Sequence, residues 1–285
     1  MNILMRWFVV LRGYAWPASI APISIAAAYS YKRGWFNFYD FLVIFVAGLL
    51  IHTSGNLINT YYDFVNGIDK DDADDIGIVK NLVKPSTVIK LAWLLLAIGC
   101  VLGIYLVFKY SLYSFLIIGV VGVALTVAYT ANPFSLKYKA IGELVIFLCF
   151  GPLIVSGSVM IFAKRFIMES VIYSLPTAFL IVNLLLSNNI RDYSSDKKSG
   201  IKTIVDVFGI KKSEILYILL HILSYIVALW ILNLSYATFA FFICIPLSIR
   251  IFTLLKRQEY SALNRESAKF ILFFGLIFIS AILWG

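Results

Sequence analysis

The pattern that decides the fold of this chain is first seen in residues 41–63, FLVIFVAGLLIHTSGNLINTYYD. Apolar side chains fill most of this stretch, which ends in the polar pair Asn59-x-x-x-Asp63. A second apolar segment ends in Asn188-x-x-x-Asp192-x-x-x-Asp196. Residues spaced i, i+4 and i+8 lie near one helix face, and carboxylates beside a membrane span indicate a functional site. The two clusters therefore predict helices whose polar ends hold a cation between them.

The composition indicates a polytopic membrane protein. Of the 285 residues, 61% are hydrophobic and 14% charged, with a mean hydropathy of +0.92. Apolar stretches of bilayer-spanning length alternate with short polar segments. Such spans are helical because lipid offers no hydrogen-bond partners to unpaired backbone groups. We expect an all-α fold in a single domain (1–285): nine transmembrane helices, as two four-helix halves plus one, around a central cavity. The expected spans are 14–31, 40–64, 88–108, 111–131, 142–163, 168–189, 214–232, 236–255 and 267–284.

Basic residues are distributed unevenly over the expected loops. With nine spans, 19 of the 24 Lys and Arg residues fall on the side of the N-terminus and 5 on the other. Because Lys and Arg accumulate in cytoplasmic loops, we expect a cell (plasma) membrane protein with its N-terminus and both polar clusters cytoplasmic. Loops at about 65–87 and 190–213 are expected to cap the site. This bias explains the net charge of +9, so no nucleic-acid partner is expected.

The ligand chemistry of the two clusters favours a hard divalent cation. Their side chains offer amide and carboxylate oxygens without sulfur or imidazole, which suits Mg²⁺ or Mn²⁺. The three Cys residues lie far apart within apolar segments, and we interpret them as packing residues. Magnesium prefers one or two carboxylates together with substrate phosphates, so we expect a substrate diphosphate to bind the metal together with the two clusters. The cations available to bind it are Arg191, Lys197, Lys202, Lys70 and Lys137.

A substrate with its diphosphate at the membrane surface and its apolar part in a cavity between helices is expected to be a polyprenyl diphosphate. Its departure leaves an allylic carbocation, which aromatic rings stabilise through their negative faces. The aromatic residues placed to contribute are Tyr61, Tyr62, Phe64 and Tyr129. A turn at Asn132-Pro133 brings Lys137 toward the same cap. Glu143 begins the fifth span, where both a role at the helix N-terminus and a catalytic role remain open.

These residues resemble the motifs of the UbiA superfamily of intramembrane prenyltransferases, over almost the whole chain. The second motif of that family, Asp-x-x-x-Asp, is present as Asp192 and Asp196. The first, Asn-x-x-x-Asp-x-x-x-Asp, departs at its last position, where Gly67 stands and Asp69 follows. Four segments are similar to the menaquinone-pathway branch of 1,4-dihydroxy-2-naphthoate prenyltransferases and their animal vitamin K relatives: Arg12–Ser19, Gly55–Asp69, Lys137–Glu143 and Asn188–Thr203.

The resemblance implies Mg²⁺-dependent transfer of a polyprenyl group to the naphthoate ring, with loss of the ring carboxylate as CO₂. It implies catalytic roles for Asp63, Asp192 and Asp196, of which Asp192 or Asp196 would handle the acceptor's hydroxyl proton. Two Mg²⁺–diphosphate ligand sets are implied: Asn59, Asp63 and Asp69, and Asn188, Asp192 and Asp196. Neutralisation of the leaving group is implied for Arg191, Lys137 and Lys197. Whether Asp69 or the run Asp71–Asp75 completes the first set stays open.

Other functions are also compatible with parts of the pattern. Within the superfamily, the acceptor could be another quinone precursor, a tetrapyrrole or a glycerol-lipid alcohol, or the enzyme could be a terpene cyclase. A cation transporter needs polar residues near the bilayer midplane, whereas these carboxylates gather at one face. The Asp-Gly-x-x-Ala-Arg signature of CDP-alcohol phosphatidyltransferases is absent from the sequence. We expect Asp63 and Asp192 to lie at the membrane edge rather than in a packed core, so that alanine substitutions abolish turnover without unfolding.

Overall fold

The computed structural model describes residues 2–68, 76–198, 200–233 and 235–285. Asp69, Lys70 and the run Asp71–Asp75 lie outside these ranges, and with them part of the first predicted ligand set. Within the described ranges the chain is helical and has no β-strand. The elements are α1 (Ile3–Val10), η1 (Gly13–Ala15), α2 (Pro17–Lys32), α3 (Phe38–Val65), α4 (Ile76–Val79), α5 (Pro85–Tyr110), α6 (Phe115–Ala128), η2 (Leu136–Tyr138), α7 (Gly142–Leu148), the π-helical η3 (Cys149–Leu153), α8 (Ile154–Ala163), α9 (Glu169–Lys198), α10 (Ile204–Phe208), α11 (Ile210–Ile231), η4 (Tyr236–Cys244), α12 (Ile245–Lys256) and α13 (Tyr260–Trp284).

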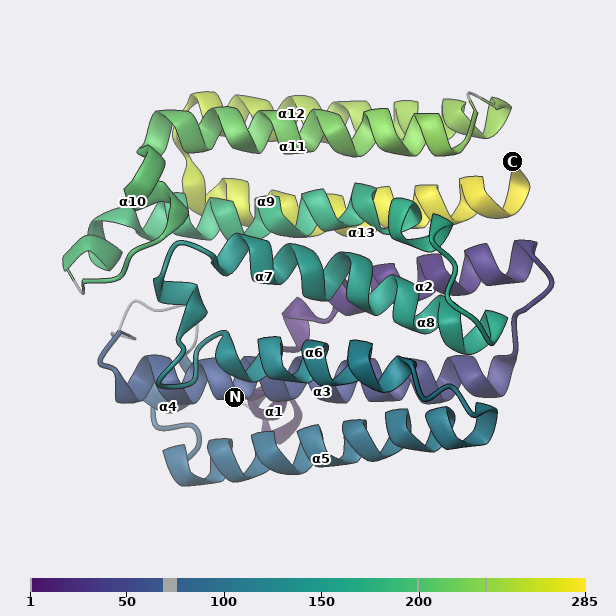
Figure 1. Cartoon of the computed structure of the whole chain (residues 1–285). Helices are drawn as coiled ribbons and strands as arrows, with labels where there is room; N and C mark the ends of the chain where they lie inside the picture. Colours follow the sequence, from purple (N-terminus) through teal and green to yellow (C-terminus); the bar gives the residue numbers. More distant parts are fainter. Residues whose placement is uncertain (1, 69–75, 199, 234) are drawn as a thin grey trace.

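The long helices run side by side as a bundle (Figure 1). In the part of the chain that the structure describes, seven helical segments are long and apolar enough to cross a membrane. An eighth span is formed if α1 and residues 13–32, which meet at a 56° bend, are taken together. The predicted all-α membrane architecture is therefore confirmed.

The count of nine spans is not confirmed, although each predicted segment coincides with a helix. The fourth segment, predicted at 111–131, is the 14-residue helix α6. At 1.5 Å per residue this helix is about 21 Å long, shorter than the hydrocarbon core of about 30 Å. The predicted break before it is confirmed, because α5 ends at Tyr110 and Ser111 adopts a left-handed conformation with φ of 53°.

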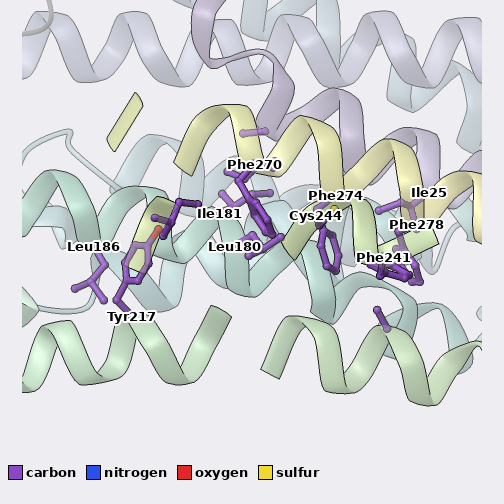
Figure 2. Close-up of a cluster of buried hydrophobic side chains, with 14 of the residues drawn as sticks. Ile25, Leu180, Ile181, Leu186, Tyr217, Phe241, Cys244, Phe270, Phe274 and Phe278 are labelled. Carbon is purple, nitrogen blue, oxygen red and sulfur yellow. The ribbon is translucent and has the colours of Figure 1, made fainter. Parts of the chain in front are cut away.

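The C-terminal helix α13 is central to the packing rather than an appendage to two halves. It packs against α2 and α9, and its residues Phe270, Phe274 and Phe278 are fully buried. Figure 2 shows these rings among Leu180 and Cys244 and other side chains from neighbouring helices. Because lipid is as apolar as these rings, close packing rather than removal from water stabilises their contacts, and this packing holds α2 beside α9.

The predicted cap loops are partly helical. Helix α9 has 30 residues, about 45 Å, so its polar end extends beyond a hydrocarbon core of about 30 Å. The predicted loop 190–213 therefore contains the end of α9 and all of α10. In the predicted loop 65–87, the short helix α4 is the main described element. Closure of these segments over a site remains a prediction.

A buried ionic cluster closes the end of the bundle opposite the two polar motifs. Asp40, at the start of α3, is fully buried. Its carboxylate accepts hydrogen bonds from Lys109 (2.9 Å), Tyr110 (2.8 and 2.9 Å) and Lys164 (3.2 Å). These donors come from the end of α5 and from the residue after α8. Because a buried charge is costly unless paired, Asp40 holds three chain segments together.

We predict that Asp40→Ala lowers the free energy of unfolding by about 1–3 kcal/mol, because Tyr110 and two partly exposed lysines lose the buried carboxylate that accepts their hydrogen bonds. The measurement is the thermal or denaturant unfolding midpoint of the purified protein in detergent. The matched control is Glu259→Ala, which removes an exposed pair with Arg257 at 3.9 Å and is expected to cost less than about 1 kcal/mol. Equal effects of the two substitutions would contradict the role of Asp40.

Candidate active site

The end of α3 explains why the first motif departs from the family pattern. The helix stops at Val65, and Gly67 follows with φ of +68°. The backbone nitrogens of Gly67 and Ile68 donate to the carbonyls of Phe64 (3.1 Å) and Asp63 (2.8 Å), the pattern of a Schellman cap. The residue at position 67 therefore lies beyond the end of α3. Of the three motif positions 59, 63 and 67, the first two share a face of this helix.

Asp63 is buried at the centre of the first cluster. Its carboxylate accepts hydrogen bonds from Lys137 Nζ at 2.7 Å, from Asn59 Nδ2 at 2.6 Å and from the hydroxyl of Tyr138. Its exposed fraction is 5%. The expectation that Asp63 lies outside a packed core is therefore wrong, because the linker after α6 folds over it. Asp63→Ala would leave the ammonium of Lys137 without this partner and would destabilise the fold.

The α6–α7 linker, residues 129–141, joins the two motifs. Its Lys137 and Tyr138 bind Asp63, and Asn132 donates to the side chain of Asn66 at 3.4 Å. A few residues later, Ala140 N donates to the carbonyl of Lys202 at 2.8 Å, just beyond the end of α9. The ends of α3 and α9 consequently lie at the same end of the bundle, on the left in Figure 1.

The second cluster lies on the polar end of α9. Asn188, Asp192 and Asp196 are all within this helix, so the i, i+4, i+8 prediction holds for them. Arg191 makes a two-point ion pair with the carboxylate of Asp192, Nε to Oδ1 at 2.7 Å and Nη2 to Oδ2 at 2.6 Å. The side chain of Asp192 is 40% exposed, so it lies outside a packed core, as predicted.

Charged residues of both clusters affect the pKa of Asp196. Burial and the neighbouring charge of Asp192 raise the pKa of Asp196 to about 6, while Lys137 acts in the opposite direction. The charges of Asp206 and Asp63 also contribute to the raised pKa of Asp196. Since like charges disfavour ionisation and a nearby cation favours it, this cluster of carboxylates is suited to an added positive charge.

An apolar cavity of about 570 Å³ begins beside the first cluster and runs between the helices. Its wall includes Asn59 and Tyr129 near the polar end, and Phe115 and Phe150 further along. The π-helical segment η3 contributes to the same wall, and such segments often mark functional sites. Most other lining residues are aliphatic or glycine. The volume is within the usual range of ligand-binding cavities.

Some predicted residues are not brought to this cavity. Tyr62 packs against Tyr61 with ring centroids 5.3 Å apart, in a cluster with α1 and α5 residues. Phe64 is exposed. Of the four aromatic residues predicted to face the substrate, Tyr129 is the one that lines the cavity. Lys197 is exposed, with its ammonium 5.8 Å from the ring centroid of Tyr193.

Arg12 is a site residue that the charge pattern did not distinguish. Its guanidinium donates to Asn59 Oδ1 at 3.2 Å, so it joins the first cluster from the segment before α2. In the sequence it is one of many basic residues on the same expected side. The sequence feature that could have identified Arg12 is its position at the start of Arg12–Ser19, one of the four segments that are similar to the menaquinone-pathway branch. Glu143 was left open between two roles, and it accepts a hydrogen bond from Asn189 at 2.7 Å, which ties α7 to α9.

The donor set fits a hard divalent cation that also binds a substrate. Among the described residues, no three Asp, Glu, His or Cys side chains converge as a complete metal site. Asn188 Oδ1 is buried and has no hydrogen-bond partner in the described part of the chain. Such an orphaned acceptor beside Asp192 suits a cation, and Mg²⁺ commonly takes one or two carboxylates with the rest of its oxygens from phosphates and water.

Comparison with known proteins places this site in a family. Residues 19–281 match the UbiA prenyltransferase family. The chain is 31% identical to UbiA prenyltransferase domain-containing protein 1 of Xenopus tropicalis over 280 residues, which is 97% of this chain and 81% of that protein.

Two solved structures share the fold. A UbiA homolog from Archaeoglobus fulgidus bound to GPP and Mg²⁺ has a TM-score of 0.63 at 17% identity, over 96% of this chain and 99% of that one. A structure described for digeranylgeranylglyceryl phosphate synthase also has a TM-score of 0.63, at 22% identity and 99% coverage of both chains. This chain therefore belongs to the UbiA prenyltransferase family and is an integral membrane prenyltransferase.

Proposed function

We propose that the protein transfers a polyprenyl group from its diphosphate to an aromatic acceptor, 1,4-dihydroxy-2-naphthoate, in menaquinone biosynthesis. The observation that carries this proposal is the ion pair of Asp63 and Lys137, which is joined through Asn59 to the wall of an apolar cavity. The cluster suits a diphosphate with its metal, and the cavity suits an isoprenoid chain. The acceptor rests on the resemblance of the sequence segments to the menaquinone-pathway branch.

Binding of the diphosphate is assigned to residues of both clusters. Asn59 and Asp63 on α3, and Asn188, Asp192 and Asp196 on α9, would hold Mg²⁺, as the solved homolog with GPP and Mg²⁺ supports. The metal would neutralise charge on the departing diphosphate. Lys137 and Arg191 would bind the same oxygens, as charge-assisted donors do. Arg12 is added to this set from its contact with Asn59.

The reaction proposed here breaks the allylic C–O bond, and the electron pair leaves with the diphosphate. The apolar cavity wall would keep water from the positive carbon, and Tyr129, which lines the cavity near its polar end, is an aromatic ring placed to stabilise it. A C–C bond then forms to the acceptor ring, whose carboxylate leaves as CO₂. Asp192 or Asp196 takes the proton of an acceptor hydroxyl as the ring attacks and returns it when CO₂ leaves.

The membrane location of the site is part of the proposal. The excess of Lys and Arg on the side of the two clusters supports a cytoplasmic active site in the cell membrane. A cation transporter is not supported by the family match. The cavity also lacks the row of carboxylates that an ion pathway requires, since its described lining contains no Asp or Glu.

The proposed function predicts Mg²⁺-dependent product formation by the purified protein with geranylgeranyl diphosphate and 1,4-dihydroxy-2-naphthoate, measured by mass spectrometry. Chelation by EDTA is expected to stop turnover, and added Mg²⁺ to restore it. Parallel reactions contain 4-hydroxybenzoate, a glycerol-based alcohol or no acceptor. Transfer to one of these alone would replace the proposed acceptor, and a cyclised hydrocarbon without acceptor would indicate a terpene cyclase.

We predict that Asp63→Asn and Asp192→Asn each reduce turnover at least about a hundredfold, because each removes charge needed to hold the leaving group. Asparagine preserves volume, and Asp192 is 40% exposed, so the unfolding midpoint of Asp192→Asn is expected to stay close to that of the wild type. The midpoint of Asp63→Asn is expected to fall, because Lys137 loses its ion pair, so turnover is measured at a temperature at which both variants are folded. The matched control is Asp206→Asn, at a carboxylate of the same end that caps α10 through Thr203. Wild-type rates from either motif variant would overturn the assignment of these carboxylates.

For Lys137→Met we predict a rise of about tenfold or more in the KM for the prenyl diphosphate, because a charge-assisted donor is lost. The KM for the acceptor is expected to change much less. The control is Lys139→Met, two residues away in the same linker, where the side chain is exposed. If the two variants have the same KM for the diphosphate, Lys137 acts only as an ordinary loop charge.

A further inference from the structure

A line of polar side chains continues from the diphosphate cluster into the otherwise apolar cavity. His52, Asn56 and Asn59 all line the cavity, and with Asp63 they follow one face of α3 at spacings of three and four residues. At 1.5 Å per residue, Asn56 and His52 lie about 10 and 16 Å along the helix axis from Asp63. Polar groups at this depth beside a membrane-spanning segment are functional candidates.

His52 is held in a fixed orientation with one nitrogen left over. Its Nδ1 is 2.8 Å from Ser19 Oγ of α2, and its ring lies edge-on to Phe150 with centroids 4.8 Å apart. Nε2 has no hydrogen-bond partner among the side chains that the structure describes. Whichever atom donates in the bond to Ser19, Nε2 offers one hydrogen-bonding position to a molecule in the cavity.

Asn56 supplies a second unused group one helical turn away. Its Nδ2 is buried and makes no hydrogen bond within the described residues. Buried amide donors are almost always paired in native proteins, and an unpaired one requires an explanation. A ligand oxygen in the cavity would provide the missing partner.

The chemistry of the reactants indicates which reactant His52 and Asn56 would bind. A prenyl chain has no hydrogen-bonding atoms, and the diphosphate belongs to the cluster around Asp63 and Lys137. The remaining polar reactant is the acceptor, whose two hydroxyl groups lie on opposite sides of one ring. One hydroxyl can then face the carboxylates of the site while the other lies deeper in the cavity.

We propose that His52 and Asn56 bind an oxygen substituent of the aromatic acceptor and thereby orient its ring toward the reacting carbon. Ser19 is a positioning residue that fixes the imidazole. This inference rests on the proposed function, because it requires a hydroxylated aromatic acceptor. It assigns selectivity for that acceptor to α2 and α3, at a distance from the carboxylates that bind the diphosphate.

The test measures initial rates of His52→Phe and Asn56→Leu in the full-length protein with geranylgeranyl diphosphate, Mg²⁺ and 1,4-dihydroxy-2-naphthoate. Each variant is expected to raise the KM for the acceptor about tenfold or more, with the KM for the diphosphate unchanged. His52→Asn and Asn56→Gln, which keep hydrogen-bonding groups, are expected to recover part of the loss. His221→Phe is the matched control, because His221 is also buried and bonded to a serine, Ser248 at 3.0 Å, but does not line the cavity.

A second measurement separates hydrogen bonding from cavity shape. 2-Naphthoate, which lacks both hydroxyl groups, is added as a competitor of the acceptor. Its Ki is expected to be the same for the wild type and both variants, because a hydrogen-bonding site discriminates only between ligands that differ in the hydroxyl. Unchanged acceptor KM values, or equal rises in acceptor KM and 2-naphthoate Ki, would overturn this inference alone. Absence of transfer by the wild-type protein would overturn the proposed function, and this inference with it.

Discussion

The carboxylate of Asp63 is the group on which the arrangement of the site depends. A buried carboxylate is unfavourable unless it is paired, and this one is paired with Lys137 and Tyr138 from the α6–α7 linker. The linker continues to a backbone bond with Lys202, beyond the end of α9. A single buried charge thus brings together the ends of two helices that lie far apart in the sequence.

The cavity lies in a bundle with ionic clusters at both ends. At one end Asp63 binds Lys137, and at the other Asp40 binds Lys109 and Lys164. Both clusters include α3, so this helix is held at its two ends while its middle lines the cavity. Helix α5 approaches α3 closely at Gly99, where a Cβ would lie 2.7 Å from Ile51. The wall that faces substrate is therefore formed on a firmly held helix, as precise placement of reactants requires.

Several features of the site were readable in the sequence, and others were not. The helical periodicity of Asn188, Asp192 and Asp196 predicted their shared face, and α9 has it. The glycine in place of the last Asp of the first motif is explained by a chain reversal at Gly67, with φ of +68°. Tyr62 does not line the cavity, because adjacent positions on a helix point in different directions and this side chain packs toward α1 and α5.

The sequence by itself determined the membrane-embedded helical architecture and the two polar clusters with their oxygen-donor side chains. These follow from local properties, namely apolar length, helical spacing and the type of ligand atom. Only the tertiary structure decided that Arg12 joins Asn59, that Lys137 lies on Asp63, and that His52 and Asn56 line the same cavity. The physical reason is that loop paths and helix rotations are set by packing and by the pairing of buried charges between segments distant in sequence.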